Sequence, residues 1–154
     1  MINNSKNPGT AKIFESLKNS VSDLVLEPAE ALMAISILAT TADGNLSEEE
    51  KWTLSANHLR IFKSYSSNQF EALLNKVWKL TQKYSSQAVF AAAKVALTSK
   101  LRESAFAMAA DIVLSDGVLV AEEKEFLLQL WHALDIPDEI GEKILNVMII
   151  KNCP

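Results

Sequence analysis

The chain lacks the residues from which several common kinds of site are built. Its 154 residues include one cysteine, Cys153, so neither a disulfide framework nor a thiolate metal cage can form within the chain. Only four glycines and four prolines are present, and no glycine-rich phosphate loop or nucleophile elbow occurs among them. Basic residues are fewer than acidic ones, 15 against 19, so we expect no nucleic-acid partner.

Long hydrophobic runs are also missing. The longest run, ALMAISILA at 31–39, is far shorter than the roughly 20 residues that span a bilayer. The polar N-terminus, MINNSKNPGT, is unlike a secretory signal. We therefore expect a soluble, cytoplasmic protein that does not insert directly into a membrane.

What the chain does contain is helical periodicity. Hydrophobic residues make up 49% of the sequence, enough for a sizeable core, and no stretch shows a strand pattern. We predict an all-α fold of about eight short helices in a compact orthogonal or bundle arrangement. The expected helices cover 10–24, 27–42, 47–62, 70–80, 88–97, 98–115, 121–134 and 137–150. Residues 1–9 are predicted to be a disordered N-terminal tail, 10–150 a single helical domain, and 151–154 a C-terminal tail.

Two segments of the chain repeat one another at an offset of 73 residues. Residues 31–59 align with 104–132, so that TTADGNLSEEEKWTL falls on VLSDGVLVAEEKEFL. Each copy reads as a helix, an Asp-Gly turn and a second helix, with the turns at 43–44 and 116–117. Two matched units in one small domain usually pack as a pseudo-symmetric pair, which would bring the two acidic turns into related positions.

Helix capping accounts for the first acidic turn better than for the second. Ser47 and Glu50 have the spacing of a capping box. The residue that matches Ser47 in the second copy is Val120, which has no side-chain oxygen, so capping leaves Glu123 unexplained. The aspartates of both turns also follow helix C-termini, where the macrodipole disfavours an anion by roughly 0.3–1 kcal/mol. Both departures favour a compensating cation.

Neither turn is a calcium loop by itself. With Gly44 at loop position six, positions one and three are Ala39 and Thr41, which have no carboxylate. A single site shared by the two turns would still provide enough oxygens for one divalent ion, either Ca²⁺, Mn²⁺, Mg²⁺ or Zn²⁺. Asp111 is read either as a solvated or hydroxyl-paired residue or as an extra ligand near the second turn. The candidate metal ligands are Asp43, Glu49, Glu50, Asp111, Asp116, Glu122 and Glu123.

The two stretches TADGNLSEEE and SDGVLVAEEKEFLLQLWHALDIP resemble the doubled ADG-x-[IVL]-x-x-x-E pattern of the TerB-like tellurite-resistance domain. The resemblance covers roughly residues 28–150 and implies an all-helical, non-enzymatic protein of chemical-stress responses. It further implies divalent-metal binding through an acidic face, and protein partners such as a membrane-associated stress complex. The family motif would carry over to Asp43 with Glu49 or Glu50, and to the equivalent acids of the second turn, where Ser115 and Val120 depart from the usual pattern.

An alternative is a protein-interaction scaffold in which the acidic turns are only helix caps and an apolar helix face docks a partner. Enzyme classes fit less well, because the residues three positions before His58 and His132 are Ser55 and Gln129, not the glutamate of a di-iron motif. Both histidines are predicted to be partly buried packing residues. A metal-dependent hydrolase that uses the same glutamates ranks last.

The remaining conspicuous side chains have structural interpretations. Trp52, Trp78 and Trp131 are predicted to be core or core-edge anchors. Asp138 and Glu139 begin the last predicted helix, where they complement the helix dipole.

Overall fold

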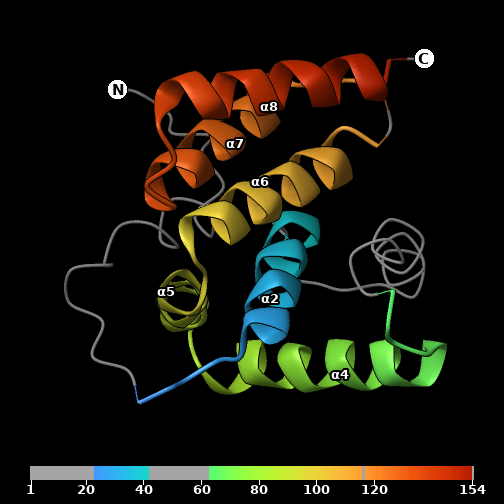
Figure 1. Ribbon diagram of the computed structural model, residues 1–154, viewed down its shortest axis with the longest axis vertical. Helices are drawn as coiled ribbons and strands as arrows, with labels where there is room; N and C mark the ends of the chain where they lie inside the picture. Colours follow the sequence, from blue (N-terminus) through green and yellow to red (C-terminus); the bar gives the residue numbers. More distant parts are fainter. Residues whose placement is uncertain (1–22, 42–62, 116, 154) are drawn as a thin grey trace, which may run out of the picture.

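The computed structural model describes residues 23–41, 63–115 and 117–153, which form six α-helices (Figure 1). The helices are α2 (Pro28–Thr40), α4 (Ser67–Lys83), α5 (Ser86–Ala96), α6 (Ser99–Val113), α7 (Ala121–Ala133) and α8 (Asp138–Lys151). No strand occurs in these ranges, which confirms the all-α class.

The number of helices differs from the predicted eight. The predicted helix at 47–62 lies outside the described residues, and so does the one at 10–24 apart from its last two positions. Leu24 lies in an irregular segment that leads into α2, so its assignment to a helix is wrong. Ser66 caps α4, so that helix begins at Ser67, three residues before its expected start at residue 70.

α2 is the central helix of the described part of the chain. Ten of its thirteen residues, 30–39, are buried, and a helix that is apolar on nearly all sides belongs in the interior. It packs against α4, α5 and α6, as Figure 1 shows. The only hydroxyl in this buried run, Ser36, donates to the carbonyl of Leu32 at 2.9 Å, so its polar group is satisfied within the helix.

α6 joins this central helix to the C-terminal pair of helices. It packs against α2 on one side and against α7 and α8 on the other (Figure 1). Phe106 of α6 meets Trp131 of α7 edge to face, with ring centroids 5.7 Å apart. Phe126, Leu127 and Leu130 of α7 are buried, and so is Leu134 at its C-terminal cap.

Two of the three tryptophans can be compared with their prediction. Trp131 is buried and Trp78 packs against the core, so both are the anchors that the sequence predicts. Trp52 lies outside the described residues. None of the helices in the described ranges is both long and apolar enough to cross a membrane.

The helices that precede the two acidic turns end at equivalent positions. The last residues of α2 and α6, Thr40 and Val113, are 73 positions apart, the offset of the sequence repeat. The two helices also contact each other. The rest of the first unit lies in residues 42–62, beyond the described ranges, so the pseudo-symmetric pairing of whole units stays a prediction.

Candidate functional site

The seven predicted metal ligands divide into two groups. Asp43, Glu49, Glu50 and Asp116 lie outside the described residues. Asp111 lies in the last turn of α6, and Glu122 and Glu123 lie in the first turn of α7. The described ligands therefore flank the second turn, whose glycine, Gly117, has a positive φ of 82°.

Asp111 is held by the end of α8. Its Oδ1 accepts hydrogen bonds from Lys151 Nζ at 2.7 Å and from Asn152 Nδ2 at 2.8 Å. The Asp111 side chain is only 19% exposed, so this ion pair is shielded from most of the solvent. The carboxylate is thus neither solvated nor hydroxyl-paired, because a lysine 40 residues away neutralises it. A metal that bound Asp111 would have to compete with Lys151.

Glu123 has a capping role. Its Oε1 accepts a hydrogen bond from the backbone N–H of Val120 at 3.1 Å, which satisfies one donor at the start of α7. Val120 cannot return the bond, since its side chain has no acceptor. The inference that capping leaves Glu123 unexplained is therefore wrong, because half of a capping box suffices. Glu122 lies beside it in the first turn, where the helix dipole favours a carboxylate.

Within the described residues, no group of three or more histidine, cysteine, aspartate or glutamate side chains is arranged to hold a metal ion. Glu122 and the two acids discussed above do not converge into such a group. A site on this side of the domain would therefore draw its remaining ligands from residues 42–62 or from residue 116.

A buried carboxylate that the sequence analysis missed lies at the start of α2. Glu30 Oε1 accepts the backbone N–H of Glu27 at 2.9 Å, and its Oε2 lies 2.6 Å from Lys76 Nζ of α4. Burial raises the pKa of Glu30, but the Glu27 hydrogen bond and the Lys76 ammonium together outweigh it and lower that pKa. An acid at the third position of a helix after Pro28 is a recognisable capping signal, whereas the partner on α4 is not encoded locally.

A second polar cluster lies where α7 meets α8. Asp138 Oδ1 accepts the indole N–H of Trp131 at 3.0 Å and lies 2.8 Å from His132 Nε2. The hydrogen bond from Trp131, then that from His132, lowers the pKa of Asp138. The prediction of a partly buried His132 is wrong, because its side chain is 59% exposed and pairs with this carboxylate. Asp138 therefore binds two side chains of α7 in addition to complementing the dipole of α8. His58 lies outside the described residues.

The chain between these helices turns through a left-handed residue. Asp135 has φ 57°, and the N–H groups of Asp135 and Ile136 bond to the carbonyls of His132 and Trp131, which is a Schellman motif. This turn directs α8 back along α6 and α7 (Figure 1).

The carboxylate of Asp135 also ties the turn to α5 and α6. Its Oδ2 lies 2.8 Å from Lys94 Nζ and 3.9 Å from Arg102 Nη1. The hydrogen bond from Lys94 lowers the pKa of Asp135, and the charges of both cations add to that effect. Arg102 in turn donates from Nε and Nη2 to the carbonyl of Lys94, which closes the C-terminus of α5.

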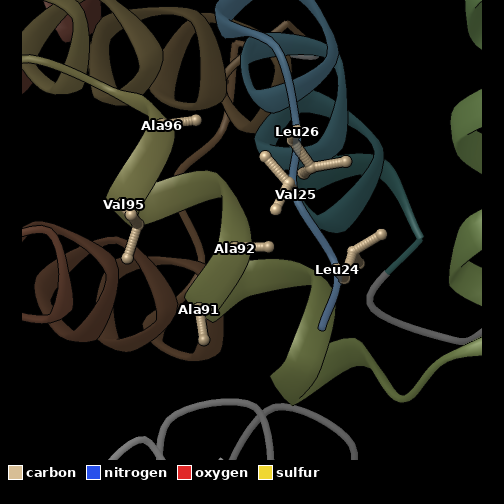
Figure 2. Close-up of a pocket in the computed structure, with 7 residues that line it drawn as sticks. All are labelled: Leu24, Val25, Leu26, Ala91, Ala92, Val95 and Ala96. Carbon is tan, nitrogen blue, oxygen red and sulfur yellow. The ribbon is translucent and has the colours of Figure 1, made fainter. Parts of the chain in front are cut away.

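An apolar groove lies between α5 and the segment that precedes α2. Figure 2 shows its lining, residues 24–26 on one side and Ala91, Ala92, Val95 and Ala96 of α5 on the other. This α5 groove has a volume of about 290 Å³ and no charged residue in its lining. Leu26 and Ala92 are buried, whereas Val25 and Val95 are 88% and 84% exposed.

Comparison with known proteins gives one result. The chain matches the model of the family described as tellurite resistance protein TerB over residues 29–144. Neither the curated proteins nor the solved structures include a match. The matched range contains four of the six described helices in full, all of α2 except Pro28, and the first half of α8. The chain therefore belongs to the TerB family of tellurite resistance proteins.

Proposed function

We propose that this TerB domain binds a divalent cation, without catalysing a reaction, as part of a cytoplasmic chemical-stress response such as tellurite resistance. The ligands would be Asp43 with Glu49 or Glu50 from the first turn, and Asp116 with Glu122 from the second. An all-carboxylate set of this kind suits Ca²⁺, Mg²⁺ or Mn²⁺ better than Zn²⁺.

The observation that carries the proposal is the contact between α2 and α6. The two Asp-Gly turns begin three residues beyond Thr40 and Val113, the ends of these helices, and the helices pack on one another. In Figure 1 the C-terminal end of α2 meets α6. Turns that leave two packed helices at equivalent positions can contribute to one shared site. A cation bound there would offset both the charge of the carboxylates and the negative ends of the two helix dipoles.

Two of the seven candidates take supporting positions in this proposal. Asp111 is neutralised by Lys151, and one oxygen of Glu123 is used by the N-terminus of α7. We therefore place both at the edge of the site and expect them to contribute less to cation affinity than the aspartates of the turns.

Calorimetric titration of Ca²⁺, Mg²⁺, Mn²⁺ and Zn²⁺ into the metal-free protein tests the proposal. Binding should be seen for the wild type and lost in the double variant Asp43→Asn/Asp116→Asn. Glu142→Gln, which removes one exposed carboxylate from α8, is the matched control and should bind like the wild type. Absence of binding in the wild type, or equal binding in all three proteins, would contradict the site.

An interaction scaffold is the second candidate, and the capping bond of Glu123 favours it. In that case the acids stabilise helix termini and the protein acts through protein partners, among them a membrane-associated stress complex. A chelator should then leave the melting temperature unchanged. Recovery of the same partners by wild type and by Asp43→Asn/Asp116→Asn, with no cation bound by either, would favour the scaffold over the metal site.

A further inference from the structure

We propose that the α5 groove is a docking site for the chain's own residues 10–22. The groove shares no residue with the acidic turns, so the proposal does not depend on cation binding. It rests on the chemistry of the groove, on the pattern of the sequence just before it, and on how closely the two are connected.

The groove presents apolar side chains to solvent. Every residue that lines it is aliphatic, and its two rim residues, Val25 and Val95, are the most exposed large hydrophobic residues in the described ranges. In Figure 2, Val25 and Ala92 are turned toward the space between the segment and α5. Apolar surface of this kind is covered favourably by other apolar side chains.

The size of the groove favours a few side chains over a small-molecule ligand. Its volume of about 290 Å³ is at the lower limit of ligand pockets, which are typically about 300–1,000 Å³ and include convergent polar groups. The lining offers no polar side chain that could orient such a ligand. A short apolar stripe of a peptide segment needs none.

Residues 10–22, with the sequence TAKIFESLKNSVS, carry such a stripe. Ile13, Phe14, Leu17 and Val21 recur at helical spacing, and the polar residues fall between them. Lys12 and Lys18 lie off this stripe, so an apolar face could be covered while both charges remain in water.

Residues 10–22 are connected to the groove by a single residue. Residue 22 is separated by one residue, Asp23, from Leu24, which already lines the groove. At no more than about 3.6 Å per residue, Val21 lies within about 11 Å of Leu24 and Leu17 within about 25 Å. A segment tethered this closely has an effective concentration in the millimolar range, far above that of a second molecule in dilute solution.

Cross-linking of the full-length chain tests the docking. In a Cys153→Ser background, Ser20→Cys is combined with Val95→Cys on the groove rim, and a short bis-maleimide is added. The matched control replaces Val95→Cys by Val147→Cys, an exposed valine of α8 away from the groove. We expect an intramolecular link several-fold more abundant at position 95 than at position 147, measured by mass spectrometry of the digested monomer.

A disruption pair completes the experiment. Phe14→Asp/Leu17→Asp should reduce the link at position 95 to the level seen at position 147, whereas Lys12→Asp/Lys18→Asp should retain it. Circular dichroism confirms that the helical content of each variant is kept. Equal links at both positions, no link at position 95, or a link found only between two chains would each overturn the proposal, and the last would indicate a second copy as the occupant.

Discussion

Gly141 of α8 lies directly against the indole ring of Trp131. A Cβ atom added at this glycine would lie 2.5 Å from Trp131 Cδ2 and 2.9 Å or less from two further ring atoms. The ring cannot retreat easily, because Phe106 contacts it edge to face and Asp138 accepts its N–H. The close approach of α8 to α7 therefore requires a residue without a side chain.

Gly141→Ala should accordingly destabilise the domain. Alanine favours a helix over glycine by about 1 kcal/mol, but overpacking a buried contact costs about 1–3 kcal/mol, and we expect the clash to prevail. The free energy of unfolding from urea titration checks this. The neighbouring exposed residue is the control, and Glu142→Ala should change that free energy by no more than about 0.5 kcal/mol. An equal effect at both positions would contradict the contact.

The Glu30–Lys76 pair predicts an ordered series of variants. Glu30→Ala removes a buried acceptor from the Glu27 N–H and from Lys76, and should cost about 1–3 kcal/mol in the free energy of unfolding. Glu30→Gln keeps an oxygen for the backbone bond and should cost less. Lys79→Ala, at an exposed lysine of α4, the helix that carries Lys76, should leave the free energy of unfolding unchanged. A Gln variant as unstable as the Ala variant would mean that the cap contributes nothing.

Stability should fall in acid. The pKa values of Glu30, Asp135 and Asp138 are all lowered by folding. The unfolded chain therefore binds protons more readily, and the stability that these groups provide is full above the ordinary carboxyl pKa of about 4. It is lost as the pH falls through their lower, folded values. Urea titrations at about pH 6 and about pH 3 measure the loss in the free energy of unfolding between the two pH values. Glu30→Gln should make this loss smaller. An unchanged difference would exclude Glu30 as a contributor.

Two substitutions at Asp135 separate the cost of its left-handed backbone from the contribution of its carboxylate. Asp135→Gly relieves the left-handed φ while losing exposed contacts to Lys94 and Arg102, and each effect is worth about 1 kcal/mol or less, so stability should change little. Asp135→Ala loses the contacts without relieving the backbone and should be about 1 kcal/mol less stable than the glycine variant. Thermal unfolding of the two variants side by side decides the point. Equal stability would mean that the φ value carries no cost.

Asp111→Asn tests whether Asp111 is a ligand of the cation or only stabilises the contact between α6 and α8. The substitution weakens a shielded ion pair with Lys151 and should lower the free energy of unfolding by about 1 kcal/mol. Cation affinity, measured by the same calorimetry as for the turns, should stay within about twofold of the wild-type value. A loss of cation binding as large as that of Asp43→Asn/Asp116→Asn would place Asp111 among the ligands.

The helices could be predicted from the sequence because their signals are local. The expected helices at 27–42 and 121–134 match α2 and α7 to within two residues at each end. Boundaries moved by a few residues where a polar stretch turned out to contain a cap, as at the start of α4.

The polar contacts could not be predicted in the same way, since their partners are distant in the chain. Lys76 pairs with a glutamate 46 positions earlier, and Lys151 with an aspartate 40 positions earlier. His132 is predicted to be a packing residue because a lone histidine packs more often than it binds a metal. In the structure the His132 ring is paired with Asp138, which lies beyond the turn after α7. Hydrophobic periodicity gives no information about the geometry of that turn. Four of the seven candidate ligands lie outside the described residues and stay predictions.

The attachment of Lys151 and Asn152 to Asp111 joins the end of α8 to the helix that leads into the second acidic turn. Binding equilibria that share such a contact are reciprocal. If cation binding at the turn loosens the hold of Asp111 on Lys151, then a modification or partner that withdraws Lys151 must change cation affinity by the same factor. The C-terminal helix would in that case adjust cation affinity from outside the ligand set, through the helix end from which the second turn leaves.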